Sequence, residues 1–164
     1  MKDIKLKNRW LIAAAAVGIH SSIGSVYAFS VITNPAKELF GVEEAAIKWA
    51  FKIAILLLGL SAALLGKWVE KVGPKVSGIT AGVFYGVGIL GSGLAVQLQS
   101  MPLFLISYGF IGGIGLGIGY ITPVSTLVKW FPDKRGLATG MAIMGFGFSA
   151  LLFGPLMQML FDAV

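Results

Sequence analysis

The sequence predicts an all-α, polytopic membrane protein with five transmembrane helices. Hydrophobic residues make up 57% of its 164 positions and charged residues only 12%, and the mean hydropathy is +0.88. A soluble globule of this size could not keep so much apolar surface out of water. The charges lie mainly in short connections between long apolar runs, as expected of a chain that crosses a bilayer repeatedly.

The apolar runs divide the chain, residues 1–164, into spans of a single transmembrane domain. Each run is long enough to cross about 30 Å of hydrocarbon at about 1.5 Å per residue. Charges and turn residues separate the runs. The spans are expected at about residues 10–33, 45–65, 76–98, 103–128 and 137–161.

The first span follows a basic arm and runs from Trp10 to about Thr33. A basic start, an apolar run and a small-residue step near Ala28 could also indicate a cleaved signal peptide. The run of roughly 23 residues exceeds the apolar region of a signal peptide and favours a span. Pro35 and the acids that follow it predict an outer loop over residues 34–44.

A charged hairpin over residues 66–75 joins the second and third spans. At the start of the second span, Glu44 faces the positive end of the helix dipole, and Lys48 is expected to pair with it one turn later. Gly73 and Pro74 make the hairpin turn.

The uncharged link 97–102 leads into the fourth span, and Pro132 and Gly136 break the helix before the fifth. Small residues recur at four-residue spacing in several spans and predict close helix contacts. The Gly-rich run 112–119 lacks the spacing and the preceding strand of a nucleotide-binding loop.

The distribution of lysine and arginine predicts the orientation in the membrane. Cations gather in the N-terminal arm, in the hairpin 66–75 and in the connection 129–136, whereas the outer loops hold only Lys37. Basic loops stay on the cytoplasmic side, so the N-terminus is predicted to be cytoplasmic, in a cell (inner or plasma) membrane. Topology also accounts for the net charge of +6, and no nucleic-acid partner is expected.

The sequence lacks the combinations of residues that form the active site of a soluble enzyme. The chain has one histidine and no cysteine, and its acids lie in loops or at span ends. Neither a metal cluster nor a pair of catalytic carboxylates can be assembled from them. We therefore expect no enzyme, no metal and no cofactor.

Two groups of residues resemble known transporter motifs. The first group consists of Gly66, Glu70, Lys71, Gly73 and Lys75. These residues resemble the motif of the loop between helices two and three of the major facilitator superfamily. Glu70 stands where Asp is usual, and Pro74 where a cation is usual. Segments 59–62, 112–123 and 129–140 are similar to the oxalate:formate antiporter family. The resemblance covers essentially the whole chain and implies helices one to five of an incomplete N-terminal six-helix half.

The resemblance implies transport of small organic anions, such as oxalate, formate or monocarboxylates, by alternating access within a complete transporter. The implied partners are a small carboxylate, the lipid bilayer, and a missing C-terminal half or another copy. Gly109 stands where many proton-coupled members carry Arg, which suits an exchanger or uniporter. The alternative is a truncated or split fragment that does not transport alone and acts only as a membrane partner subunit.

The resemblance also implies that the hairpin is a conformational gate. In the superfamily, the acidic position held here by Glu70 engages a helix of the second half and favours the outward-open state. Glu70 and the neighbouring cations Lys71 and Lys75 would latch to the cytoplasmic ends of other helices. Gly66 would let the second and third spans approach closely.

His20 is a candidate for substrate binding because it lies near the middle of the first span. An ionisable side chain at that depth is costly and by default marks a functional position facing the bundle interior. The alternative is a neutral imidazole with a structural hydrogen bond to a backbone carbonyl or to a hydroxyl group.

Lys52, Tyr27 and Trp49 lie at a similar depth, nearer the outer side. Lys52 either attracts an anion that enters from outside or extends its amine to headgroup water. Tyr27 and Trp49 either wall a small-carboxylate pocket or belong to an aromatic belt at the interface. Tyr120 and Thr122, on the cytoplasmic half of the fourth span, are further cavity candidates.

Overall fold

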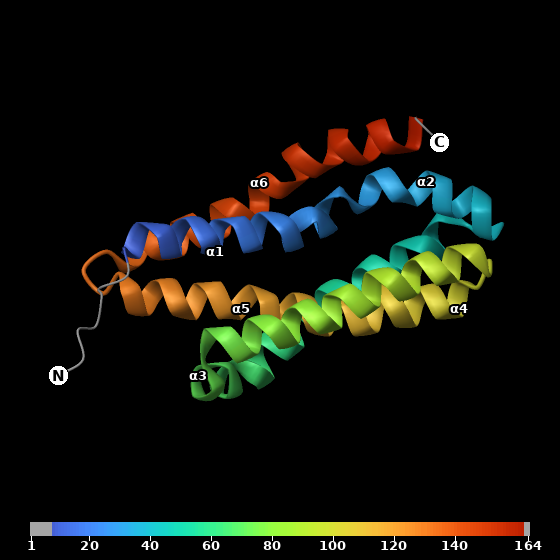
Figure 1. Cartoon of the computed structure of the whole chain (residues 1–164). Helices are drawn as coiled ribbons and strands as arrows, with labels where there is room; N and C mark the ends of the chain where they lie inside the picture. Colours follow the sequence, from blue (N-terminus) through green and yellow to red (C-terminus); the bar gives the residue numbers. More distant parts are fainter. Residues whose placement is uncertain (1–7, 163–164) are drawn as a thin grey trace.

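The computed structural model describes residues 8–162 as an elongated bundle of helices that run roughly along one direction (Figure 1). No strand occurs in this part of the chain. In chain order the elements are α1 (Arg9–Ile23), the 3₁₀ helix η1 (Gly24–Ala28), α2 (Phe29–Phe40), α3 (Glu44–Gln97), α4 (Met101–Phe104), the π-helix η2 (Leu105–Gly112), α5 (Gly113–Trp130) and α6 (Arg135–Asp162).

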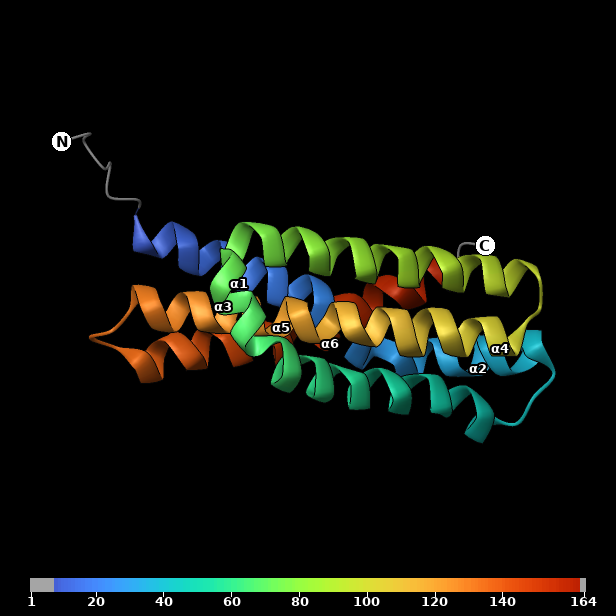
Figure 2. The ribbon, with the colours of Figure 1, turned by 90° about the horizontal axis from the view of Figure 1, so that it is seen from below.

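Within residues 8–162, four stretches of helix are long and apolar enough to cross a membrane: Arg9–Phe40, Glu44–Gln97, Met101–Trp130 and Arg135–Phe161. The second has 54 residues and contains two predicted spans, 45–65 and 76–98. Figure 2 shows it doubling back, with its second part running beside α5. The helices therefore accommodate five crossings, and their placement and orientation in a bilayer stay a prediction.

The reversal within α3 depends on one residue, Gly73. Its φ of 79° and ψ of 171° are the only non-helical angles inside the element, and a residue with a side chain rarely adopts such a φ. Pro74 follows at a helix start, where its missing N–H costs nothing. The predicted hairpin 66–75 is thus helical on both sides of Gly73. We call residues 44–72 the first arm of α3 and residues 74–97 the second arm.

The expectation of a loop over residues 34–44 was wrong, because α2 continues to Phe40 with Pro35 inside it. The helix begins anew at Phe29 after the 3₁₀ turn and buries Phe29, Thr33 and Ala36, so packing outweighs the single hydrogen bond that proline removes. It ends at Gly41, whose φ of 62° and ψ of 32° give the left-handed conformation common at helix ends.

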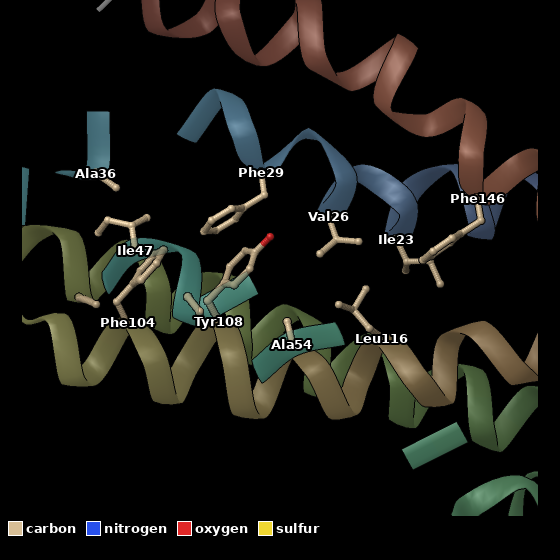
Figure 3. Packing of buried hydrophobic residues seen from close by; sticks show 12 residues of the cluster. Ile23, Val26, Phe29, Ala36, Ile47, Ala54, Phe104, Tyr108, Leu116 and Phe146 are labelled. Atoms are coloured by element: carbon tan, nitrogen blue, oxygen red, sulfur yellow. The ribbon is translucent and has the colours of Figure 1, made fainter. Parts of the chain in front are cut away.

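The largest buried cluster joins η1 and α2 to the first arm of α3 and to η2. Figure 3 shows Phe29 and Tyr108 facing each other inside it, and their ring centroids are 5.1 Å apart. Tyr108 also stacks on Phe104 at 5.6 Å. A second cluster surrounds the fully buried Phe131 where α1, α5 and α6 meet. The bundle end that holds Arg9, Gly73 and residues 131–134 is called the basic end.

Candidate functional site

A cavity of about 540 Å³ lies between the η1–α2 segment and the first arm of α3. We call it the polar cavity because cationic, amide and hydroxyl groups line it. Its wall consists of Tyr27, Phe29, Ser30, Thr33, Asn34, Glu44, Lys48, Phe51 and Lys52. Two of the predicted site residues, Tyr27 and Lys52, therefore meet at one cavity although they come from different helices.

The local fold of η1 directs Tyr27 into this cavity. Val26 and Ala28 are buried, whereas Tyr27 between them is 46% exposed. Gly24 allows η1 to lie against α6, because a Cβ there would come within 2.8 Å of the Ser149 Cβ and would also strike the Phe146 carbonyl. The tight 3₁₀ turn thus separates a packed side from an open side within a few residues.

The two lysines of the first arm have different electrostatic surroundings. Lys48 Nζ is 2.5 Å from Glu44 Oε1, which confirms the predicted pair. The hydrogen bond from Lys48, together with its charge, holds the pKa of Glu44 below its ordinary value. Within the described residues Lys52 forms no ion pair, and its Nζ lies 4.7 Å from the centroid of the Trp49 ring. Lys52 is therefore the cation of this cavity whose charge is not balanced by a carboxylate.

Behind Tyr27, a row of rings leads into the bundle. Phe146 of α6 contacts Tyr27, with ring centroids 5.1 Å apart, and His20, at 5.8 Å. His20 stacks on Tyr120 at 5.2 Å, with ring planes only 15° apart. Sequence reasoning missed Phe146, because nothing in the pattern of the fifth span distinguishes it from residues facing lipid.

His20 is fully buried and does not line the polar cavity. Its Nδ1 is 2.7 Å from the carbonyl oxygen of Ala142 on α6, and its Nε2 is 2.9 Å from the carbonyl oxygen of Tyr120 on α5. A single imidazole thereby connects α1 to both α5 and α6.

Thr122 lies apart from these residues. It is buried, donates a hydrogen bond to the Ile118 carbonyl at 2.7 Å, and lines a different cavity of about 550 Å³ between α1, the second arm of α3 and α5. We call this second cavity the apolar cavity. Glycine, alanine and branched aliphatic residues make up most of its wall, among them Ala15, Ala81 and Gly82.

The predicted gate loop contacts α5 at the basic end. Glu70 Oε1 is 3.5 Å from Lys129 Nζ, with both side chains 58% exposed, so Glu70 has a partner within this chain. Lys71 and Lys75 form no ion pair among the described residues. A Cβ at Gly66 would meet nothing within 4 Å, so the expected close approach at that glycine was wrong.

Gly109, by contrast, is packed tightly in η2. A Cβ there would lie 3.1 Å from the Ala50 carbonyl oxygen and from Ile53 on the first arm of α3. The position is therefore a helix contact without room for a long cationic side chain. In the described part of the chain, no group of three or more His, Cys, Asp or Glu side chains could hold a metal ion.

Comparison with known proteins identifies the same family in a sequence profile and in individual relatives. The sequence profile of the Major Facilitator Superfamily matches residues 11–164. The oxalate:formate antiporter of Oxalobacter formigenes is 34% identical over 154 residues, which are 93% of this chain and 36% of that protein. Apicoplast pyruvate carrier 1 of Toxoplasma gondii is 36% identical over 80% of this chain and 23% of its own length.

Monocarboxylate transporter 1 of Mus musculus is 28% identical over 91% of this chain and 30% of its own length. The chain thus spans about a third or less of each of these relatives.

Proposed function

Because this chain belongs to the major facilitator superfamily of membrane transporters, we propose that it forms part of a carrier that moves small organic anions by alternating access. The family and its relatives are carriers rather than enzymes, and the chain is a multi-pass membrane protein. The proposed substrates are oxalate, formate or monocarboxylate-like anions, and the proposed location is the inner or plasma membrane.

The observation that carries the proposal is Lys52 in the polar cavity. Its ammonium has no carboxylate partner among the described residues, because the Glu44 carboxylate of the same cavity pairs with Lys48. The cavity also holds the hydroxyl of Ser30 and the amide of Asn34. A cation beside neutral hydrogen-bond donors is the chemistry that holds a small carboxylate. The Lys52 amine lies 4.7 Å from the centroid of the Trp49 ring, within the range of a cation–π contact.

Tyr27, Trp49, Tyr120 and His20 complete the proposed site in two layers. Tyr27 lines the cavity. Trp49 contacts Lys52, which also lines the cavity. Tyr120 and His20 stand behind Phe146 and support Tyr27 through ring contacts. Thr122 faces the apolar cavity instead, where its hydroxyl is already engaged, so we assign it no contact with the anion.

The test uses a chimera in which this chain is followed by the part of the Oxalobacter formigenes relative that lies beyond the matched region. Proteoliposomes of the chimera should exchange labelled oxalate or formate. Lys52→Gln should lower the rate at limiting substrate by roughly tenfold or more, because one charge-assisted hydrogen bond to the anion is lost.

Lys37→Gln is the control. It removes a lysine charge from the neighbouring helix α2 at an exposed position that does not line the polar cavity, so the rate should stay within about twofold. Equal losses from the two variants would contradict the proposed site. A correctly inserted chimera that exchanges no small carboxylate would contradict the proposed function.

A second candidate function is that of a partner subunit that does not transport alone. Tyr27 in the wall of the polar cavity is 46% exposed, so the described residues leave the cavity open, and facilitator sites form between two halves. If this is right, the chain alone should give no exchange, and co-expression with a separate second half should restore it. Exchange by the chain alone would exclude this candidate.

A further inference from the structure

The ring of Phe146 on α6 lies between the wall of the polar cavity and the interior of the bundle. We propose that Phe146 is a positioning residue, which holds the Tyr27 ring in one direction so that its phenol hydroxyl is aimed at the anion. The inference rests on the proposed function, in which Tyr27 belongs to the anion site. Among the described residues α6 contributes none to the wall of the polar cavity, so Phe146 acts on the anion only through Tyr27.

Three aromatic rings contact Phe146 edge to face. The ring centroids are 5.1 Å apart for Tyr27, 5.3 Å for Tyr120 and 5.8 Å for His20, and the ring planes meet at 78°, 72° and 69°. This is a geometry that aromatic pairs prefer. Phe146 is only 5% exposed, and Figure 3 shows its ring pointing from α6 into the buried cluster. The rings of Tyr120 and His20 therefore hold the surface against which Tyr27 packs.

The backbone around Phe146 is held as closely as its ring. A Cβ at Gly24 would strike the Phe146 carbonyl oxygen, and a Cβ at Gly145 would come within 3.0 Å of the Val17 carbonyl oxygen. The two glycines thus allow α6 to touch η1 and α1 at successive points, and Tyr27 follows Gly24 by three residues in η1. Close contact between helices therefore sets the distance between the Phe146 and Tyr27 rings.

The hydroxyl of Tyr27 is available to a ligand. The side chain is 46% exposed in the cavity wall, and its hydroxyl forms no hydrogen bond with another described residue. The Tyr85 hydroxyl, by contrast, lies 3.3 Å from Ser25 Oγ. A free hydroxyl donates to a carboxylate oxygen, and a donor that is already oriented loses less conformational entropy on binding. Without the Phe146 ring, Tyr27 keeps this donor but loses the surface that orients it.

The test is a double-mutant cycle in the chimera, with exchange of labelled formate measured over a range of concentrations. Tyr27→Phe removes the hydroxyl and should raise KM roughly fivefold. Phe146→Leu should raise KM about threefold with the maximal rate within about twofold, because the hydroxyl remains but is oriented less often. In the Tyr27→Phe background, Phe146→Leu should cause no further rise, since no hydroxyl is left to orient. Increases that multiply in the double variant, or an unchanged KM in Phe146→Leu, would overturn the proposal.

Phe148→Leu is the matched control. It removes a ring from the same helix at a position that is 57% exposed and lines neither cavity, so KM should stay within about twofold. Equal rises from Phe146→Leu and Phe148→Leu would also overturn the proposal.

Phe146→Met keeps most of the buried volume with a flexible side chain. It should raise KM as Phe146→Leu does, and it replaces that variant in the cycle if Phe146→Leu does not insert into the membrane. An unmodified chimera that exchanges no small carboxylate contradicts the proposed function. An active chimera in which the effects of Phe146 and Tyr27 are independent contradicts only this inference.

Discussion

The polar and apolar cavities have nearly the same volume, about 540 and 550 Å³, but their walls differ in chemistry. The apolar cavity contains hydroxyl groups too, yet each of its Ser and Thr side chains donates to a carbonyl of its own helix. These bonds are Ser22 to Gly18, Thr122 to Ile118 and Thr126 to Thr122. In the polar cavity Thr33 likewise donates to the Phe29 carbonyl of its own helix, but the Lys52 amine has no ion-pair partner within the described residues.

The comparison teaches that volume alone does not identify a binding site in a helical membrane protein. A hydroxyl that is bonded within its own helix has no hydrogen left for a ligand. The apolar cavity is a space between three helices in which the hydroxyl groups are already engaged within their own helices. The polar cavity offers a charge and donors that remain available, which is what an anion requires.

The largest expected effect concerns the helix packing beside the apolar cavity. A Cβ at Gly115 of α5 would come within 2.9 Å of the Tyr85 Cα and strike its amide nitrogen, whereas a Cβ at Gly82 would meet nothing within 4 Å. Gly115→Ala should therefore lower the free energy of unfolding by about 3 kcal/mol. Gly82→Ala should be neutral or stabilising by up to about 1 kcal/mol. Unfolding of the chain in detergent measures both, and equal stability of the two variants would contradict the packing.

The next effect separates the two cavities by function. Ser30→Leu fills the polar cavity and should lower exchange by the chimera roughly tenfold or more, because it displaces the anion from Lys52. Gly82→Leu fills the apolar cavity, where the side chain has space, and should leave exchange within about twofold. A comparable loss from Gly82→Leu would mean that the apolar cavity takes part in transport.

Local sequence spacing predicted some of these features correctly. The pair of Lys48 with Glu44 follows from their four-residue separation on one helix. The reversal at residue 73 follows from a glycine before a proline. Pro35 shows the limit of such rules, because the helix that contains it is held by packing against other elements.

Contacts between distant segments could not be predicted in the same way. Phe146 connects Tyr27 to His20 only because α6 lies beside α1. The two carbonyls at His20 come from α5 and α6 and carry no sequence signal, since every residue has one. The partner that the resemblance implies for Glu70 in a second half stays a prediction, and within this chain Lys129 lies within reach of Glu70.

The smallest expected effect is a change in stability from the ion pairs at the basic end, which connect helices and loops but line neither cavity. Arg9 Nη1 is 3.0 Å from Asp133 Oδ1, and its guanidinium carbon is 5.0 Å from the centroid of the Phe131 ring. Partial desolvation raises the pKa of Asp133. A backbone hydrogen bond and then the hydrogen bond and charge of Arg9 outweigh this effect, so the pKa lies below its ordinary value of 3.8.

Because folding lowers this pKa, the ion pair stabilises the chain above pH 3.8 and loses its effect as the pH falls through the pKa of the folded state. Arg9→Gln should lower the melting temperature by at most about 3 °C at neutral pH. The difference from the unmodified chain should shrink progressively as the pH is lowered below 3.8. Lys129→Gln removes the longer ion pair with Glu70 and should lower the melting temperature less than Arg9→Gln does. A difference for Arg9→Gln that persists in acid would assign the stabilisation to the Phe131 ring rather than to Asp133.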